Sequence, residues 1–409
     1  FLSLLSLSSS SSSLSLPLPL SLFPLLTNNM VWTIVGMILL LMSCCCSSAH
    51  ENQSSCLMNL YPFQPKLYRP PTLDHVMSTI SSKQPVPSTF ALLCDWIIGI
   101  RKKDRLVFGD PAMVPSTIFF VSKQLDHLPR VLDCLPSTIR LVLIIGDRDQ
   151  TVPMNVDHRY SYHHNMTHRW HTWLQDPRLT HFFVNHLDVP PAKKVTPLPL
   201  GMISPGLKVS HKQILEGVRT PKSEESLVLF TNRVRSGSGT WNERRQVSQL
   251  CKGDWSSFCQ ILKTHTFQHT IRKYKFLFCI HGGGIDPNPN AWTALMNGVI
   301  PIMRHFPGDD IYNDLPVLFV GERKTPETGQ YEWGPELLSA QILEEAWERL
   351  SPLYDENGSF IEKKLTLGYW WELVQAKLDY NNKSSTTTTT TTTTTTCLSS
   401  DNCTEEFHF

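Results

Sequence analysis

Neither sign of charge dominates this chain of 409 residues. It has 37 Lys and Arg against 36 Asp and Glu, which leaves a net charge of +1 at pH 7. Such a balance gives no electrostatic reason to expect a nucleic acid or an acidic membrane surface as a partner. An anionic ligand would therefore have to be held by a local cluster of side chains. Hydrophobic residues make up 41% of the chain, so a sizeable core can form.

Metal-binding cysteine spacings are missing as well. Three of the 11 Cys stand together at Cys44–Cys46, and the other eight show neither a CxxC pair nor a zinc-type spacing. Disulfides among these eight would fit an oxidising compartment, but the sequence does not give their connectivity. The eight are Cys56, Cys94, Cys134, Cys251, Cys259, Cys279, Cys397 and Cys403.

The apolar segment near the beginning of the sequence is short for a membrane span, which needs about 20 residues. It runs from Met30 (MVWTIVGMILLLM) and leads to small residues ending at Ala49, as a signal peptide does. The stretch Phe1–Leu26 before it is low-complexity and begins with Phe. We expect residues 1–49 to be a low-complexity leader with a signal peptide, or with a retained anchor if translation starts upstream. The protein would then enter the secretory pathway.

Glycosylation sequons and a threonine run point weakly in the same direction. Residues Thr386–Thr396 are all Thr, which suggests a disordered or O-glycosylated tail. Sequons arise by chance, so their number gives only weak support for exposure to a lumen. They begin at Asn52, Asn165, Asn357, Asn382 and Asn402.

Short apolar runs bounded by Gly, Pro or Asp predict the fold. Runs of this kind suit buried parallel strands, and their alternation with helical segments predicts two Rossmann-like α/β domains. The expected parts are a stem or linker (50–87), an N-terminal α/β domain (88–207), a connection (208–226), a C-terminal α/β domain (227–380) and a Thr-rich tail (381–409). The expected strands are Thr117–Val121, Ile139–Ile145, His181–Val184, Lys194–Leu200, Leu227–Phe230, Tyr274–Ile280, Val299–Met303 and Pro316–Val320.

A glycine-rich turn stands at the expected end of the strand Tyr274–Ile280. His281 is followed by Gly282, Gly283 and Gly284, and a short helix is expected at Ala291–Asn297. Glycines let a backbone approach a ligand closely, and the carboxyl end of a strand is where open α/β sheets bind nucleotides. Three glycines alone are a weak signal, because tight turns use them too.

The residues around this turn carry a resemblance to a known family. The stretch Lys275–Val320 resembles the sugar-nucleotide-binding half of exostosin-like glycosyltransferases, including the ribitol xylosyltransferase-like branch. The shared residues are Lys275-Phe276, Gly282–Asp286, Trp292, Ala294-Leu295, Gly298, Ile300-Pro301-Ile302, Asp309-Asp310 and Leu315-Pro316-Val317. Weaker similarity occurs upstream at Leu141–Asp149 and Val195–Gly201.

The resemblance implies a GT-B type glycosyltransferase architecture, an inverting reaction and a nucleotide-sugar as co-substrate, without a metal or other cofactor. The donor would lie in the C-terminal domain, near His281, Gly282–Gly284, Asp286 and Trp292. A carboxylate or His of the N-terminal, acceptor-side domain would deprotonate a glycan or glycoprotein acceptor. The expected location is the Golgi membrane or lumen, or outside the cell after secretion.

The sequence departs from the family pattern at Thr293. Similar enzymes often carry an acidic residue directly after the tryptophan, where it can accept hydrogen bonds from a ribose. The contact with the ribose would then move to Asp286 or Asp309. A catalytically inactive, lectin-like or scaffold member of the same fold is therefore an alternative.

The remaining candidate residues follow two expected strands. Arg233 and Arg235 lie in a Gly/Ser-rich loop after Leu227–Phe230, and guanidinium groups bind diphosphates well, although they would be equally ordinary as surface residues. Asp149 follows Ile139–Ile145 and is our candidate general base, with Asp188 as a second choice. Because Asp147 stands two residues before Asp149, a divalent cation is conceivable; we predict none.

A histidine-rich tract is the last feature. With Asp147 and Asp149 it would suit a secreted metal-dependent hydrolase, the least favoured alternative. The interleaved Tyr and Trp residues favour an aromatic loop or plain surface over a zinc site. The histidines are His158, His163, His164, His168 and His171, with His181 and His186 beyond them.

Overall fold

A computed structural model describes the chain from residue 86 to residue 386 with several gaps. The described residues are 86–101, 104–105, 110, 113–146, 149–156, 166–201, 210–224, 226–234, 241–262, 270–286, 289–322 and 332–386. All of them belong to one compact unit, residues 56–409. The expected leader, Asp147, Arg235, His158, His163 and His164 lie outside the described residues. In the described part, no helix is long and apolar enough to cross a membrane.

The first sheet has five parallel strands in the order β1-β4-β5-β6-β7. The strands follow one another in sequence order, so this sheet has no point at which the strand order reverses. A two-stranded antiparallel pair, β2 and β3, comes between β1 and β4 in the chain. The bounds are β1 Trp96–Ile98, β2 Ile100–Arg101, β3 Asp104–Arg105, β4 Thr117–Val121, β5 Leu141–Gly146, β6 Leu179–Val184 and β7 Val195–Pro197.

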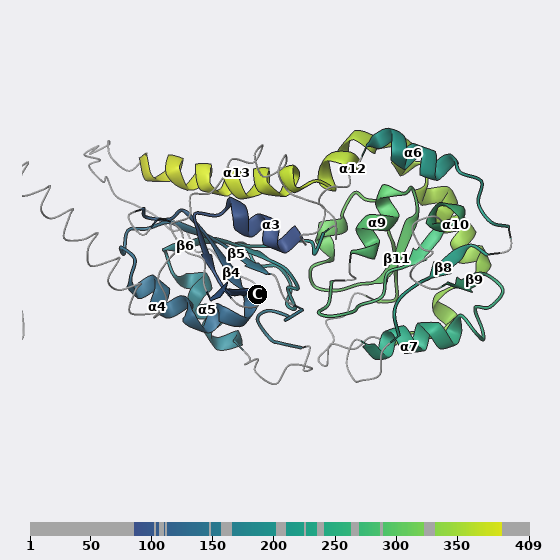
Figure 1. Cartoon of the computed structure of the whole chain (residues 1–409), viewed down its shortest axis with the longest axis horizontal. Coiled ribbons are helices and arrows are strands. Elements are labelled where there is room, and N and C mark those ends of the chain that lie inside the picture. Colours follow the sequence, from purple (N-terminus) through teal and green to yellow (C-terminus); the bar gives the residue numbers. More distant parts are fainter. Residues whose placement is uncertain are drawn as a thin grey trace, which may run out of the picture. The chain divides into compact units, whose positions relative to one another are not determined.

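Apolar side chains cover both faces of this sheet, which is why its strands read as continuous apolar runs. On β5, Val142 and Ile144 pack with helices α3 (Val86–Leu93) and α13 (Leu367–Thr386). Leu141, Leu143 and Ile145 face the opposite cluster, which contains α4 (Leu128–Asp133) and α5 (Thr167–Gln175). Figure 1 shows α3 and α13 on one side of the strands and α4 and α5 on the other. A short 3-10 helix, η1 (Ser122–His127), precedes α4.

The second sheet is also five-stranded and parallel, but its order is β12-β11-β10-β8-β9. The chain passes from β8 to β9 on one side and then returns to β10 on the other. The strand order therefore reverses between β8 and β10, which makes their carboxyl ends a topological switch point. The bounds are β8 Val228–Phe230, β9 Cys259–Ile261, β10 Phe276–Phe278, β11 Ile300–Arg304 and β12 Leu318–Val320.

Because the strand order reverses, the helices of the second sheet lie on its two faces. Figure 1 shows α7 (Trp241–Leu250) and α9 (Asn290–Met296) on opposite sides of the strands. The other elements of this part of the chain are α6 His211–Arg219, η3 Ile271–Lys273, η4 Asp309–Tyr312, η5 Pro335–Leu337, α10 Ala340–Leu350, α11 Leu353–Glu356 and α12 Gly358–Lys364.

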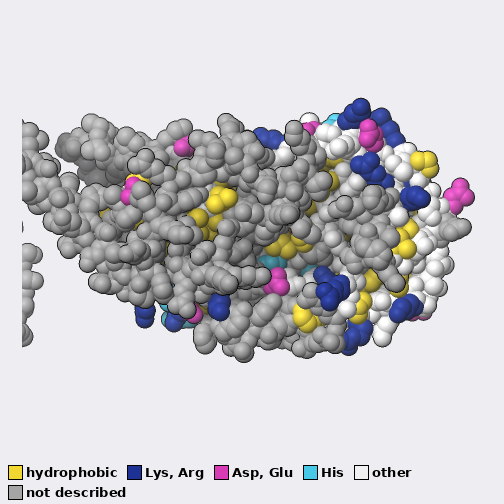
Figure 2. All heavy atoms as spheres, viewed as in Figure 1, with side chains coloured by type: hydrophobic (Ala, Val, Ile, Leu, Met, Phe, Trp, Pro, Cys, Tyr) yellow, Lys and Arg dark blue, Asp and Glu magenta, His cyan; other side chains and the backbone are white. Residues whose placement is uncertain are grey.

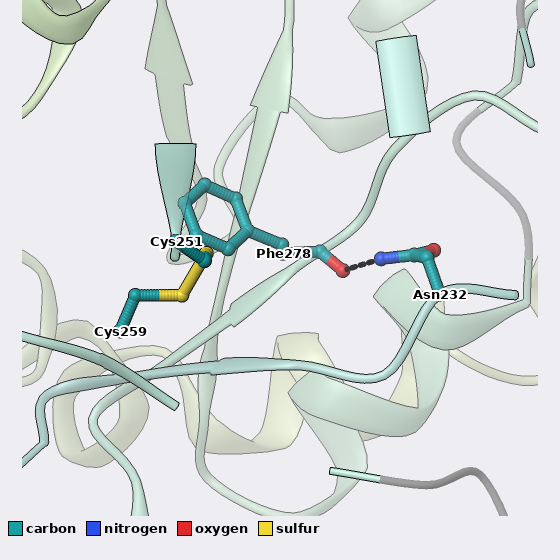
Figure 3. Close-up of a disulfide and its surroundings, with 4 residues drawn as sticks. All are labelled: Asn232, Cys251, Cys259 and Phe278. Atoms are coloured by element: carbon teal, nitrogen blue, oxygen red, sulfur yellow. Dashed lines mark hydrogen bonds between the residues drawn. A yellow bond between two sulfur atoms is a disulfide. The ribbon is translucent and has the colours of Figure 1, made fainter. Parts of the chain in front are cut away.

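A disulfide joins Cys251, just after α7, to Cys259 at the beginning of β9. It lies beside Phe278 at the end of β10 (Figure 3). The Trp255 ring, between the two cysteines in sequence, stacks on Phe278 at 5.5 Å. Cys134 also takes part in a disulfide, whereas Cys94 and Cys279 are buried thiols.

The expected strands are all present, with ends that shift by a few residues. Strands β1 and β9 and the helices α3, α4, α5 and α6 were not among the expected elements. Helix α6 lies within the expected connection 208–226, where Ile214 and Gly217 are buried on one face of an otherwise polar segment. Helix α13 continues to Thr386, past the expected beginning of the tail at residue 381. The two parallel sheets with helices give a mixed α/β architecture compatible with two Rossmann-like halves.

Candidate functional site

The glycine turn lies at the switch point of the second sheet, directly after β10. Arg244 of α7 holds the backbone of this turn: its Nε donates to the His281 carbonyl at 2.8 Å and its Nη2 to the Ile280 carbonyl at 3.3 Å. Its Nη1 donates to the carbonyl of Arg233, in the loop after β8, at 3.3 Å. One guanidinium therefore ties together the loops that follow β8 and β10.

Each of the three glycines makes room for a side chain of the protein itself. A Cβ atom at Gly282 would stand 2.3 Å from Nη2 of Arg244. At Gly284, whose φ is +70°, it would stand 2.4 Å from the His186 ring. The glycines are thus explained in part by internal packing. Gly283 is half-buried, whereas Gly282 and Gly284 are buried.

Asp149 lies against Gly283. A Cβ atom on Gly283 would stand 1.8 Å from Oδ2 of Asp149, so the carboxylate occupies the space that a side chain there would fill. Asp149 follows β5 of the first sheet and is half-buried. Two residues that the sequence suggested separately, a carboxylate after one parallel strand and a glycine after another, are therefore in contact.

Asp286 closes the turn and is fully buried. Its Oδ2 accepts the Leu200 backbone N–H at 2.6 Å, and its Oδ1 accepts the Tyr312 hydroxyl at 3.2 Å. Its own N–H donates to Nδ1 of His186 at 3.2 Å. Burial raises the pKa of the Asp286 carboxyl above its ordinary value, against the nearby His186 and these hydrogen bonds, which lower it. Both carboxylate oxygens thus bond to the protein.

A buried carboxylate also faces His281. Glu243 of α7 lies 3.1 and 3.2 Å from Nδ1 of His281 through its two oxygens, and Nε1 of Trp333 donates to it at 3.1 Å. Both partners are about 1% exposed. Because a carboxylate accepts but does not donate, a neutral His281 carries its proton on Nδ1 and keeps a lone pair on Nε2. Glu243 therefore fixes the tautomer and the ring orientation of His281.

The loop after β8 is the other half of the switch point. Nδ2 of Asn232 donates to the Phe278 carbonyl at 2.7 Å and so joins the ends of β8 and β10 (Figure 3). The Thr231 side chain is buried, and its hydroxyl has no hydrogen-bond partner among the described residues. The Arg233 side chain is exposed, while Arg235 lies outside the described residues. On the face seen in Figure 2, the described Lys and Arg side chains lie in small groups among polar and acidic ones.

Trp292 is buried on α9 and stacks on Tyr312 at 5.8 Å. Its indole N–H has no hydrogen-bond partner among the described residues. The half-buried Thr293 next to it donates its hydroxyl to the Pro289 carbonyl at 3.1 Å. Trp292 therefore packs in the core of the second sheet.

Asp188 bonds to the loop that follows Asp149: it is buried, it accepts the Met154 N–H at 2.9 Å, and burial raises its pKa. His168 and His171 are exposed on α5. His181 is buried on β6, bonded through Nε2 to the Thr196 hydroxyl at 2.8 Å. Among the described residues no group of three His, Cys, Asp or Glu is placed to hold a metal ion.

Sequence reasoning missed Glu243, Tyr312 and Trp333, and it named His186 only as an outlying member of the histidine-rich tract. His186 has a φ of +51°, which is uncommon for a residue other than Gly, but the sequence carries no sign of it. Glu243 and Trp333 look like ordinary surface and core residues until the fold brings them to His281. Arg244, on the helix that follows the candidates Arg233 and Arg235, bonds to the turn.

No protein-family model matches the chain, and no curated protein matches it.

Proposed function

We propose that the chain is an inverting glycosyltransferase of GT-B type that transfers a sugar from a nucleotide-sugar donor to a glycan or glycoprotein acceptor. The single observation that carries the proposal is the contact between Asp149 and Gly283. It joins a candidate base from one parallel sheet to the glycine turn at the switch point of another. Nucleotides bind at such switch points in open α/β sheets.

In this proposal Asp149 accepts the proton of the acceptor hydroxyl. The acceptor oxygen then forms a bond to the anomeric carbon, while the bond from that carbon to the diphosphate oxygen breaks. The nucleoside diphosphate leaves with the bonding electrons, so the configuration inverts. The exposed guanidinium of Arg233 supports this role, because Arg neutralises and hydrogen-bonds phosphate oxygens.

We also propose that the protein matures in the secretory pathway. The disulfide between Cys251 and Cys259 supports this, because stable disulfides are typical of oxidising compartments. The proposed location, the Golgi lumen or membrane or the extracellular space, is tested by imaging the full chain with a small C-terminal tag. A purely cytosolic signal would contradict it.

A donor screen by thermal shift tests the function directly, since a ligand that binds only the folded state raises its melting temperature. We expect one UDP- or GDP-sugar to raise the Tm of the purified chain and to be hydrolysed slowly. Arg233→Ala should weaken donor binding about tenfold or more, which is the ordinary scale for losing one charge-assisted hydrogen bond. Asp149→Asn should keep the shift and lose transfer to the acceptor.

A matched pair of glycine variants provides the control. Gly283→Ala places a methyl group on the Asp149 carboxylate and should abolish transfer, whereas Gly253→Ala meets only the Gln249 carbonyl at 3.5 Å and should change nothing. Equal activity of the two variants would remove the Asp149 contact from the mechanism.

Thr293 favours a second candidate, an inactive lectin-like or scaffold member of the fold. Its hydroxyl is donated to the Pro289 carbonyl, and it offers no carboxylate to a ribose. Glycan binding with no Tm shift from any donor would favour this candidate, and a gain of donor binding in Thr293→Glu would show what is missing. Activity that chelators abolish and Arg233→Ala leaves intact would favour the metal-dependent hydrolase instead.

A further inference from the structure

Asn357 stands at a junction where the backbone is fully engaged. It is the residue between α11 and α12, and its N–H donates to the Leu353 carbonyl at 2.9 Å. Its carbonyl accepts the Ile361 N–H at 2.8 Å. The position of Asn357 is therefore set by main-chain hydrogen bonds, which do not depend on its side chain.

The side chain of Asn357 is left unused at this position. Asn is favoured at the residue that begins a helix because its side-chain oxygen accepts a free N–H of the first turn. Here that capping bond is not formed, although Asn357 is the capping residue of α12. The structure records no hydrogen bond from this amide to any described residue, and the residue is half-buried.

Asn357 begins the sequon Asn357-Gly358-Ser359, and the other two residues fit the same pattern. Ser359 is exposed, and its hydroxyl makes no hydrogen bond to a described residue. Gly358 is buried, and a Cβ there would stand 1.7 Å from Nε2 of His211 on α6. Packing thus accounts for the glycine, whereas the amide and the hydroxyl that define the sequon make no hydrogen bond to a described residue.

We propose that Asn357 carries an N-linked glycan. This inference rests on the proposed maturation in the secretory pathway. The amide nitrogen of Asn357 forms a bond to the anomeric carbon of a lipid-diphosphate-linked oligosaccharide and gives up one proton. The bond from that carbon to the lipid diphosphate breaks, and the diphosphate leaves with the bonding electrons. The glycan then extends from the α11–α12 junction, beside the exposed Asp355 and Glu356.

The test uses the full chain behind a strong cleavable secretion signal in cultured animal cells, so that entry into the lumen is guaranteed. The secreted protein is treated with an amidase that converts glycosylated Asn to Asp in ¹⁸O-labelled water, and its peptides are analysed by mass spectrometry. We expect labelled Asp at position 357. An unmodified Asn357 peptide from the secreted, folded chain overturns the proposal.

Variants separate the glycan from any effect on folding. Asn357→Gln and Ser359→Ala should each remove one glycan from the intact mass, whereas Ser359→Thr should retain it. Because the Asn357 amide makes no hydrogen bond to a described residue, the Asn357→Gln variant should melt with the wild type after an endoglycosidase that leaves Asn intact has trimmed the glycans of both. An intact mass that does not change in Asn357→Gln contradicts the assignment.

A second arm distinguishes this proposal from the proposed location. The same chain is expressed without the added signal. Glycosylation at position 357 only when the signal is added would contradict a signal within residues 1–49 and leave the site standing. An unmodified Asn357 beside other occupied sequons would refute the site and leave the location standing.

Discussion

Two physical reasons can explain why glycines stand at positions 282–284 of this protein. The glycine turn resembles a ligand-binding backbone, yet each of its glycines also accommodates a side chain from elsewhere in the fold. The Asp149 carboxylate on Gly283 is the contact in which both reasons meet. A ligand at this turn would lie beside the Asp149 carboxylate. A carboxylate is suited to accept a proton from the ligand, and it is not suited to bind a phosphate group.

His181 gives a prediction about pH at this scale. Burial lowers its pKa to about 4, with Lys377 adding to the effect. In the unfolded chain His titrates near 6.5, so the stability linked to a neutral His181 is complete above pH 6.5 and is lost as pH falls towards 4. As pH falls across this range, the unfolding free energy of the wild type should drop on the order of 3 kcal/mol further than that of His181→Gln.

Urea unfolding of both proteins at a series of pH values between 7 and 4 would measure this difference. Gln can retain the hydrogen bond to the Thr196 hydroxyl, so the comparison isolates the titration. Parallel pH profiles of the two proteins would show that His181 is not the titrating group.

At the level of elements, the reversal of strand order in the second sheet places a topological switch point between β8 and β10, where the proposed donor would bind. The loops that follow β8 and β10 diverge from this point. Hydrogen bonds of Arg244 and Asn232 join the two loops. The first sheet has no reversal. The loops after its strands contain Asp149, His186 and Leu200, and each of these residues contacts the turn of the second sheet.

The disulfide is the covalent part of this arrangement. It closes a sequence separation of 8 residues between α7 and β9. A short loop of this kind contributes about 2–3 kcal/mol by restricting the unfolded chain. Replacing both Cys251 and Cys259 by Ala should lower the unfolding free energy by this amount in denaturant titrations.

Reductant gives the control for this measurement. Adding it to the double variant reports what the remaining disulfides contribute, that of Cys134 included, separately from the bond that was removed. An unchanged unfolding midpoint in the double variant without reductant would contradict the stabilising role of the α7–β9 bond.

In the whole molecule, Asp286 connects the two sheets by hydrogen bonds. It accepts the Leu200 N–H, after β7, and the Tyr312 hydroxyl, after β11. Asp286→Ala leaves both donors buried without a partner and should cost about 3 kcal/mol of stability. Asp286→Asn should cost much less, because the amide oxygen still accepts the Leu200 N–H and the NH₂ can donate to the Tyr312 oxygen.

The pH dependence of these variants has a definite sign. Burial raises the pKa of Asp286 in the folded state. The stability linked to its protonated form is therefore complete below the unfolded value, about 3.9, and is lost as pH rises through the folded value. Asp286→Asn should thus gain stability relative to the wild type when pH rises from 4 to 8 in chemical unfolding experiments. A constant difference between the two would contradict a raised pKa of Asp286 in the folded state.

The sequence by itself determined the strands with strong apolar runs, the α/β class and the position of the glycine turn. Both features are local in sequence. A strand buried on both faces is a continuous apolar run, as at Val142 to Ile145, and a tight turn is a run of glycines, as at Gly282 to Gly284. Helix α6 and strand β9 were not predicted, because only one or two residues of each are buried.

The tertiary structure alone decided which distant residues meet. Asp149 with Gly283, Glu243 with His281 and Asp286 with Leu200 come together because parallel strands bring their carboxyl ends to one edge of each sheet. Sequence spacing contains no record of that strand order, and the partner of Cys251 was equally open. The contacts that fix the candidate site depend on topology, which local pattern does not encode.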